Sequence, residues 1–158
     1  MNMKKLSIAL TTLFGIGLLI FNSCGTVPIT GRRQLNLVSD GEILAASATQ
    51  YRQFISKSQL SHNSTYNNKV TQVGRRLAAA TNIYLKQNGY ESMLSTLSWE
   101  FNVVDSKQVN AFCMPGGKIV VYTGLLNLVG NGAHSDDELA AVMGHELSHA
   151  LAKHDNER

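Results

Sequence analysis

The sequence contains little cysteine, shows no internal repeat and has no low-complexity run. With two cysteines, at most one intrachain disulfide can form. Basic side chains hardly outnumber acidic ones, 14 against 11. Without Lys4 and Lys5, which lie in an amino-terminal leader, the count falls to 12 against 11, a net charge of +1. No basic patch argues for nucleic acid, so the composition does not favour a nucleic-acid-binding protein.

Long apolar runs are also scarce, and the one that occurs lies at the amino terminus. It covers residues 6–21, 16 residues interrupted only by Ser, Thr and Gly, directly after the two lysines. Because a bilayer-spanning helix needs roughly 20 apolar residues, this run predicts a secretory signal peptide over residues 1–23 instead. Cys24 follows the small residue Ser23, as in a bacterial lipobox. We therefore expect Cys24 to be the first mature residue and to carry a lipid anchor.

The lipobox pattern is incomplete, which leaves a second interpretation open. Phe21 and Asn22 depart from the usual residues at its two outer positions, so ordinary signal cleavage with Cys24 as a plain thiol is the alternative. If Cys24 is acylated, Cys113 is the remaining cysteine, and we expect it to be buried or partly buried. The mature chain of 135 residues, 24–158, is long enough for one domain.

Periodicity and turn residues predict a mixture of helices and strands. Residues 24–38 resemble a tether, and residues 39–158 carry the regular elements. A capping box at 39–42 predicts a helix to about residue 59, and Gly89 would end a later helix. The predicted elements are helices over 39–59, 68–87 and 124–129, a polar loop over 61–68, and strands over 97–105, 109–114 and 118–122, the last two forming a hairpin around residues 115–117.

The stretch that carries most information about chemistry is His145-Glu146-Leu147-Ser148-His149, an H-E-x-x-H motif. It lies in a predicted helix that begins with a second capping box, with Ser135 as N-cap, and contains no proline to break it. Residues four apart share one face of a helix, so His145 and His149 can reach one Zn²⁺, and Glu146 lies beside them as a base. The opposite side should be buried, and it is formed by Leu139, Met143, Leu147 and Ala150.

A catalytic zinc site of this kind needs a third protein ligand. His154 lies nine residues after His145 and would point away from it on a continuous helix. Asp155 occupies the position of the third metzincin ligand, but Ala152 stands where that pattern needs a glycine to turn the chain. The remaining option is a Glu on a later helix, beyond Arg158, as in His₂Glu sites.

The sequence resembles metallopeptidase family 48, the group of HtpX-like, Oma-like and LoiP/BepA-like zinc endopeptidases. The resemblance covers essentially the whole mature chain and suggests the lipoprotein branch. It rests on four stretches: 27–35 (VPITGRRQL), 110–117 (NAFCMPGG), 121–126 (VYTGLL) and 137–150 (DELAAVMGHELSHA).

The resemblance implies a role for several residues. His145 and His149 match the ligands of a single zinc ion, and Glu146 matches the catalytic base. Asn110, Ala111 and Phe112 match an edge strand beside the active-site cleft, where an extended peptide could add as a further strand. A plain hairpin is the alternative for that strand. Cys113 replaces a small or apolar residue, either as an inhibitory thiolate near the zinc or as an inert buried thiol.

The implied fold is α+β and zincin-like, with helices and a small antiparallel sheet or hairpin beside the motif helix. The third ligand of this family is a Glu well downstream, so we expect the chain to be the amino-terminal part of a truncated metallopeptidase domain. The implied function is a membrane-anchored zinc metalloendopeptidase acting on misfolded polypeptides of the bacterial envelope, facing the periplasm, with the outer membrane favoured.

Two alternative functions stay open. One is a non-catalytic lipoprotein, a chaperone-like assembly factor that keeps the peptidase fold without its activity. The other is a metzincin-like enzyme that uses Asp155 as its third ligand. Neither alternative involves nucleic acid.

Overall fold

The computed structural model describes residues 24–26, 29, 31, 33–35 and 38–152. The predicted signal peptide, His154 and Asp155 therefore lie outside the described residues. The chain divides into two compact units, residues 1–39 and 40–158. In the first unit, strand β1 (Cys24–Thr26) pairs antiparallel with strand β2 (Arg33–Leu35), with Cys24 opposite Leu35. The segment predicted as a tether thus contains a short two-stranded sheet.

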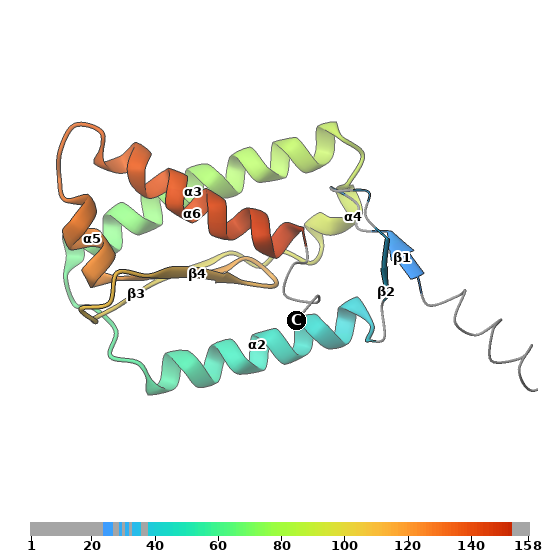
Figure 1. The fold of residues 1–158 in the computed structure, drawn as a ribbon, viewed down its shortest axis with the longest axis horizontal. Coiled ribbons are helices and arrows are strands. Elements are labelled where there is room, and N and C mark those ends of the chain that lie inside the picture. Colours follow the sequence, from blue (N-terminus) through green and yellow to red (C-terminus); the bar gives the residue numbers. More distant parts are fainter. Residues whose placement is uncertain (1–23, 27–28, 30, 32, 36–37, 153–158) are drawn as a thin grey trace, which may run out of the picture. The chain divides into compact units, whose positions relative to one another are not determined.

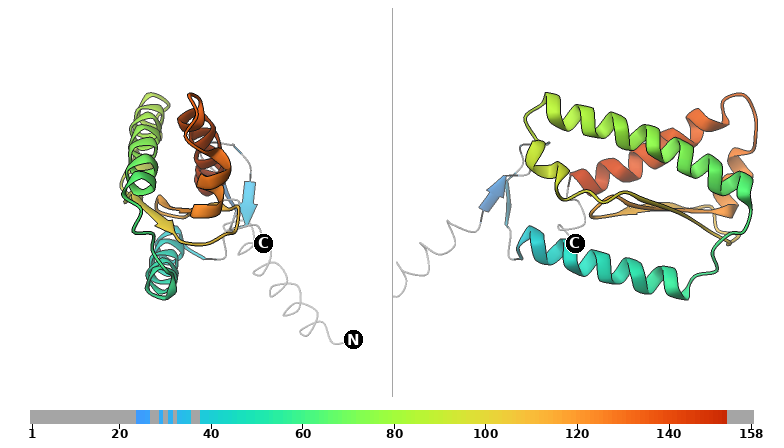
Figure 2. Two further views of the ribbon diagram at one scale, coloured as in Figure 1. Left: turned by 90° about the vertical axis from the view of Figure 1, so that its left-hand side faces the viewer. Right: turned by 180° about the vertical axis from the view of Figure 1, so that it is seen from behind.

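The second unit has three layers, with a sheet between helices (Figures 1 and 2). Helix α2 covers one face of the sheet, and helices α3 and α6 cover the other. The elements are α2 (Asp40–Lys57), α3 (Ser64–Gln87), α4 (Glu91–Leu94), β3 (Glu100–Val104), β4 (Ala111–Met114), β5 (Lys118–Tyr122), α5 (Thr123–Val129) and α6 (Ser135–Leu151). None of the helices in the described part of the chain is long and apolar enough to cross a membrane.

The sheet is mixed, and its strand order is β3-β5-β4. The β4–β5 hairpin agrees with the prediction, and Gly116 and Gly117 form its turn at φ angles of +92° and +79°. The prediction of an antiparallel sheet is wrong for β3, which pairs parallel with β5. Alternation of side chains identified a strand around Phe101 but carries no information about the partner or direction of that strand.

Strand β5 is buried on both faces because it lies in the middle of the sheet. Ile119 and Val121 face the cluster beneath α3 and α6, and Val120 faces α2. All three are 0% exposed. Successive strand residues point to opposite faces, so this one strand joins the two halves of the core.

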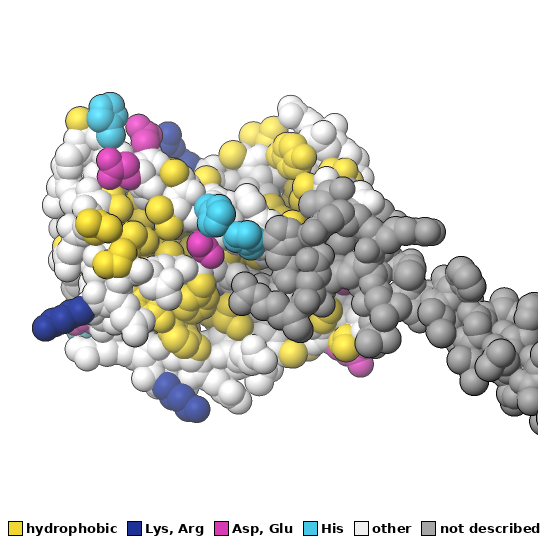
Figure 3. Space-filling view, viewed as in Figure 1, with side chains coloured by type: hydrophobic (Ala, Val, Ile, Leu, Met, Phe, Trp, Pro, Cys, Tyr) yellow, Lys and Arg dark blue, Asp and Glu magenta, His cyan; other side chains and the backbone are white. Residues whose placement is uncertain are grey.

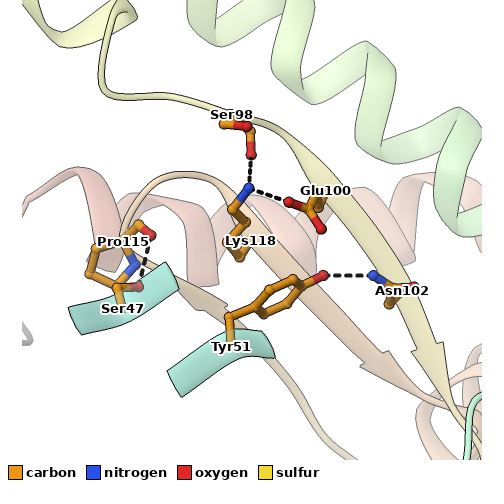
Figure 4. A network of polar contacts seen from close by, with 7 residues as sticks. All are labelled: Ser47, Tyr51, Ser98, Glu100, Asn102, Pro115 and Lys118. Atoms are coloured by element: carbon orange, nitrogen blue, oxygen red, sulfur yellow. Dashed lines mark hydrogen bonds and ion pairs between the residues drawn. The ribbon is translucent and has the colours of Figure 1, made fainter. Parts of the chain in front are cut away.

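Helix α2 is attached to the sheet by a polar network (Figure 4). Ser47 Oγ donates to the Pro115 carbonyl at 2.9 Å, and Asn102 Nδ2 donates to the Tyr51 hydroxyl at 2.6 Å. Lys118, 7% exposed, donates to the Ser98 carbonyl at 2.6 Å and pairs with Glu100. Burial raises the pKa of Tyr51 above its ordinary value of 10.0, and the nearby Glu100 carboxylate adds to the rise.

Several helix ends differ from the prediction. Helix α2 ends at Lys57, and α3 begins at Ser64, where the Asn63 side chain accepts a hydrogen bond from the Tyr66 amide at 3.2 Å. The predicted loop over 61–68 is therefore wrong in its second half. The prediction of Ser135 as N-cap of α6 is also wrong, because His134 holds that position without a capping side-chain bond. Ser135 Oγ instead accepts a bond from Lys69 Nζ at 2.6 Å.

Candidate metal centre

Helix α6 presents the H-E-x-x-H motif because its opposite side is fully packed. Leu139 and Met143 are 0% exposed and Leu147 is 4% exposed, as predicted, and Ala150 is partly buried. The first turn carries Asp136, Asp137 and Glu138, whose charges stabilise the amino end of the helix. Because the buried side of α6 is fixed in the core, the side that carries the H-E-x-x-H motif must face outward.

The imidazoles of His145 and His149 lie side by side on the outer side of α6. Their Nε2 atoms are 3.0 Å apart, their ring centroids are 4.5 Å apart, and the ring planes make an angle of 89°. Two nitrogens bound to one tetrahedral zinc at about 2.0–2.1 Å would lie about 3.3–3.4 Å apart. The observed separation is within a few tenths of an ångström of that value, so the pair fits one zinc ion.

The same 3.0 Å separation also allows a hydrogen bond between one protonated and one unprotonated Nε2. A bound metal would take the place of that proton. His145 is exposed and His149 is half-buried, so the site is open to solvent. Figure 3 shows histidine and acidic side chains together on this face of the molecule, beside hydrophobic ones.

Glu146 follows His145 on the same helix and is half-buried. Within the described residues, none of the hydrogen bonds or ion pairs uses its carboxylate. The carboxylate can therefore accept a proton from a water molecule next to the two imidazoles.

A third metal ligand is not found in the described part of the chain. No three His, Cys, Asp or Glu residues cluster there in a way that could hold a metal ion. Helix α6 ends at Leu151 with Ala152 as its C-cap. The two candidates His154 and Asp155 lie outside the described residues, so their part in the site stays a prediction.

Strand β4 forms one edge of the described sheet and packs against α6. Asn110 precedes the strand and is exposed, Ala111 is buried and Phe112 is half-buried. The Tyr122 amide donates to the Asn110 carbonyl at 3.0 Å. Because hydrogen-bonded and non-hydrogen-bonded pairs alternate along an antiparallel ladder, the peptide groups of Ala111 point away from β5.

The two faces of β4 have different surroundings. Ala111 and Cys113 belong to the core cluster that packs against α6. Phe112 points to the α2 side, where its ring meets that of Phe54 edge-on at 5.2 Å between centroids. Cys113 is 8% exposed, as predicted for a buried thiol, and its Sγ lies 3.6 Å from the Met114 carbonyl oxygen.

Lys69 supports the motif helix, and the sequence offers no signal for it. Its Nζ donates to the Gly130 carbonyl at 2.8 Å and to Ser135 Oγ at 2.6 Å, and lies 3.6 Å from Asp136 Oδ1. These contacts join α3 to the start of α6. A lysine among polar helix residues predicts a solvated side chain, and its partners lie more than 60 residues later in the sequence.

Comparisons with known proteins find related sequences for most of the chain. The family model for peptidase family M48 matches residues 64–158. The mitochondrial metalloendopeptidase OMA1 of Schizosaccharomyces pombe is 31% identical over 144 residues, which cover 91% of this chain and 39% of the relative. The human mitochondrial metalloendopeptidase OMA1 is 29% identical over 162 residues, 99% of this chain and 29% of the relative.

A bacterial relative matches a shorter stretch. The metalloprotease LoiP of Escherichia coli is 41% identical over 54 residues, 34% of this chain and 19% of the relative. The chain thus spans well under half the length of these relatives. The matched region contains helix α3, the whole sheet and the H-E-x-x-H helix. On this match, the chain belongs to peptidase family M48.

Proposed function

We propose that this protein is a zinc-dependent metalloendopeptidase with a zincin-like active site on helix α6. The observation that carries the proposal is the 3.0 Å separation of His145 Nε2 and His149 Nε2, with Glu146 on the same helix. Membership of a peptidase family and relatives named as metalloendopeptidases support it.

In the proposed mechanism, His145 and His149 hold zinc through their Nε2 atoms. We expect a third ligand outside the described residues to complete the site, and the resemblance implies a downstream Glu. Zinc, when bound, polarises the scissile carbonyl and lowers the pKa of the attacking water. The Glu146 carboxylate takes a proton from that water and transfers it to the leaving amine.

The edge strand β4 supplies a place for the substrate. The peptide groups of Ala111 point away from β5, so an extended polypeptide can pair with them in the manner of an added strand. Strand β4 packs against α6, which brings such a polypeptide next to the histidine pair. Asn110, just before the strand, and Phe112 within it flank the pairing position.

We further propose that the protein works at a membrane of the bacterial envelope, tethered by a lipid on Cys24, and that its substrates are misfolded envelope proteins. The signal-like segment 1–23 and the lipobox-like cysteine support this proposal. Bacterial relatives include LoiP and a protein of Yersinia pestis named as a β-barrel assembly-enhancing protease, whereas the OMA1 relatives are named as mitochondrial.

The test is the Glu146→Gln variant of the full-length protein. The variant should keep its zinc and lose casein cleavage by about 10²–10⁴-fold, because the base is removed and both histidines stay. Glu138→Gln, in the first turn of the same helix, is the matched control and should cleave normally. Equal cleavage by Glu146→Gln and wild type would refute the peptidase proposal. Casein binding without cleavage by the wild-type protein would support the non-catalytic assembly factor instead.

A further inference from the structure

The outward side of helix α3 carries positive charge without any negative charge. The 24 residues of α3 include Lys69, Arg75, Arg76 and Lys86 but no Asp or Glu. Lys69 is turned to the start of α6, and the other three basic residues are exposed. The whole chain is nearly balanced in charge, with 14 basic and 11 acidic residues, so its small excess of positive charge is concentrated on this helix.

The three exposed cations share one stripe with apolar side chains. At about 100° per residue, and with Arg75 at zero, Lys86 lies at about 20°, Ala79 at about 40°, Ile83 at about 80° and Arg76 at about 100°. Ile83 is 56% exposed, and Ala79 is also exposed. The buried residues of α3 lie on the other side: Val70, Val73, Gly74, Ala78 and Leu85. Figure 2 shows this helix from behind, where it lies on the outside of the second unit.

None of the ion pairs within the described residues involves Arg75, Arg76 or Lys86. The positions three and four residues from each of them along α3 hold no acid either. A nucleic acid or another polyanion would satisfy the three cations but would leave Ile83 and Ala79 in water. A surface that is both anionic and apolar satisfies both kinds of side chain.

We propose that the basic face of α3, formed by Arg75, Arg76, Ala79, Ile83 and Lys86, lies on the surface of an anionic phospholipid bilayer. The helix is about 36 Å long and lies in the plane of the headgroups. Ile83 enters the boundary between headgroups and acyl chains, while the arginines and Lys86 extend to the phosphates. This contact is separate from any lipid on Cys24 and from the peptidase chemistry.

The experiment uses the full chain with Ile83→Trp, mixed with vesicles of phosphatidylcholine containing phosphatidylglycerol at roughly 30%, a content chosen to give the bilayer a negative surface potential. The wild-type emission of Trp99, which is half-buried against Phe101, is subtracted. The emission of the introduced indole should shift to the blue and be quenched by brominated acyl chains. Vesicles of phosphatidylcholine alone should leave this indole unquenched, even if the apolar segment 6–21 inserts into them.

Matched variants, each made in the Ile83→Trp background, test the cations. Arg75→Gln, Arg76→Gln and Lys86→Gln together should weaken the response of the introduced indole about a hundredfold, because each basic residue near an anionic bilayer contributes about fivefold. Arg52→Gln with Lys57→Gln on α2 is the control and should retain the response.

Three outcomes would overturn the proposal. The introduced indole could stay unquenched in anionic vesicles, or the variant without the three cations could be quenched as strongly as the α2 control. A blue shift with duplex DNA but not with the anionic vesicles would overturn it in favour of nucleic acid. Casein cleavage is read separately, so loss of vesicle binding and loss of peptidase activity are distinguishable.

Discussion

The two histidines of the motif share one side of α6 because they are four residues apart and because Leu139, Met143 and Leu147 hold the opposite side in the core. That arrangement could be predicted from the sequence, since helical periodicity and an apolar stripe are both local signals. The 3.0 Å approach of the two Nε2 atoms depends on side-chain rotamers, and no sequence pattern provides it.

Replacement of one motif histidine should weaken zinc binding while helix α6 stays folded. His149→Ala is expected to lower the zinc affinity by more than about 100-fold. Loss of a residue that only orients a metal ligand lowers the affinity by about 10–100-fold, and loss of the ligand itself should have a larger effect. Competition with a chromophoric zinc chelator measures the affinity. His134→Ala, at the exposed start of α6, should bind zinc as the wild type does. Unchanged affinity in His149→Ala would rule out zinc coordination by this side chain.

Tyr51 should make the stability of the fold sensitive to alkaline pH. Burial raises the pKa of Tyr51 in the folded state above 10.0. Below pH 10 the hydroxyl is therefore neutral in both the folded and the unfolded state, and it does not make the free energy of unfolding depend on pH. Above pH 10 the unfolded chain ionises first, and the free energy of unfolding falls. Urea unfolding between about pH 8 and about pH 11 measures the free energy of unfolding, which should fall less steeply with pH in Tyr51→Phe than in the wild type. Tyr84→Phe, which changes an exposed side chain, should keep the wild-type dependence on pH. Parallel slopes for all three proteins would contradict this role of Tyr51.

At the scale of elements, the approach of α3 to β3 depends on Gly74. A Cβ added there would lie 2.4 Å from Phe101 Cδ1, so the ring or the helix would have to move. Gly74→Ala should destabilise the protein by about 1–3 kcal/mol. Gly144→Ala on α6 is the comparison, since the nearest atom to its Cβ would be 3.7 Å away, and it should be neutral or stabilising by up to about 1 kcal/mol. The midpoints of denaturant unfolding measure both effects. Equal shifts of the midpoint in the two variants would refute the argument that α3 approaches β3 closely at Gly74.

Helix α2 should open before the other layers do. Among its 18 residues only Ser47 and Tyr51 are buried, whereas α3 buries five residues. We expect α2 amides to exchange with solvent through local opening at a lower free energy than amides of α3 or β5. Tyr51→Ala should accelerate exchange in α2 more than in α3. Exchange of all three elements at one common rate would show that the layers unfold together.

At the scale of the whole molecule, the parts predicted from sequence are those with local signals. The hairpin around Pro115, Gly116 and Gly117 and the helix of the motif are of this kind. The parallel pairing of β3 with β5 and the contacts of Lys69 join residues far apart in the chain, and nothing local encodes them. The start of α3 escapes prediction because its cap, Asn63, stands among other polar residues that resemble a loop.

Strand β5 is paired with one strand that is close in the sequence and one that is farther away, so the two pairings are expected to form in a definite order. Strand β4 is joined to it by three residues, and a hairpin of this size closes in about 1–10 μs. Strand β3 reaches the opposite edge only after the intervening chain has folded back, and parallel pairings of this kind form slowly. We therefore expect the hairpin to be the folding nucleus. A substitution in its glycine turn should slow refolding, whereas one in β3 should mainly speed unfolding.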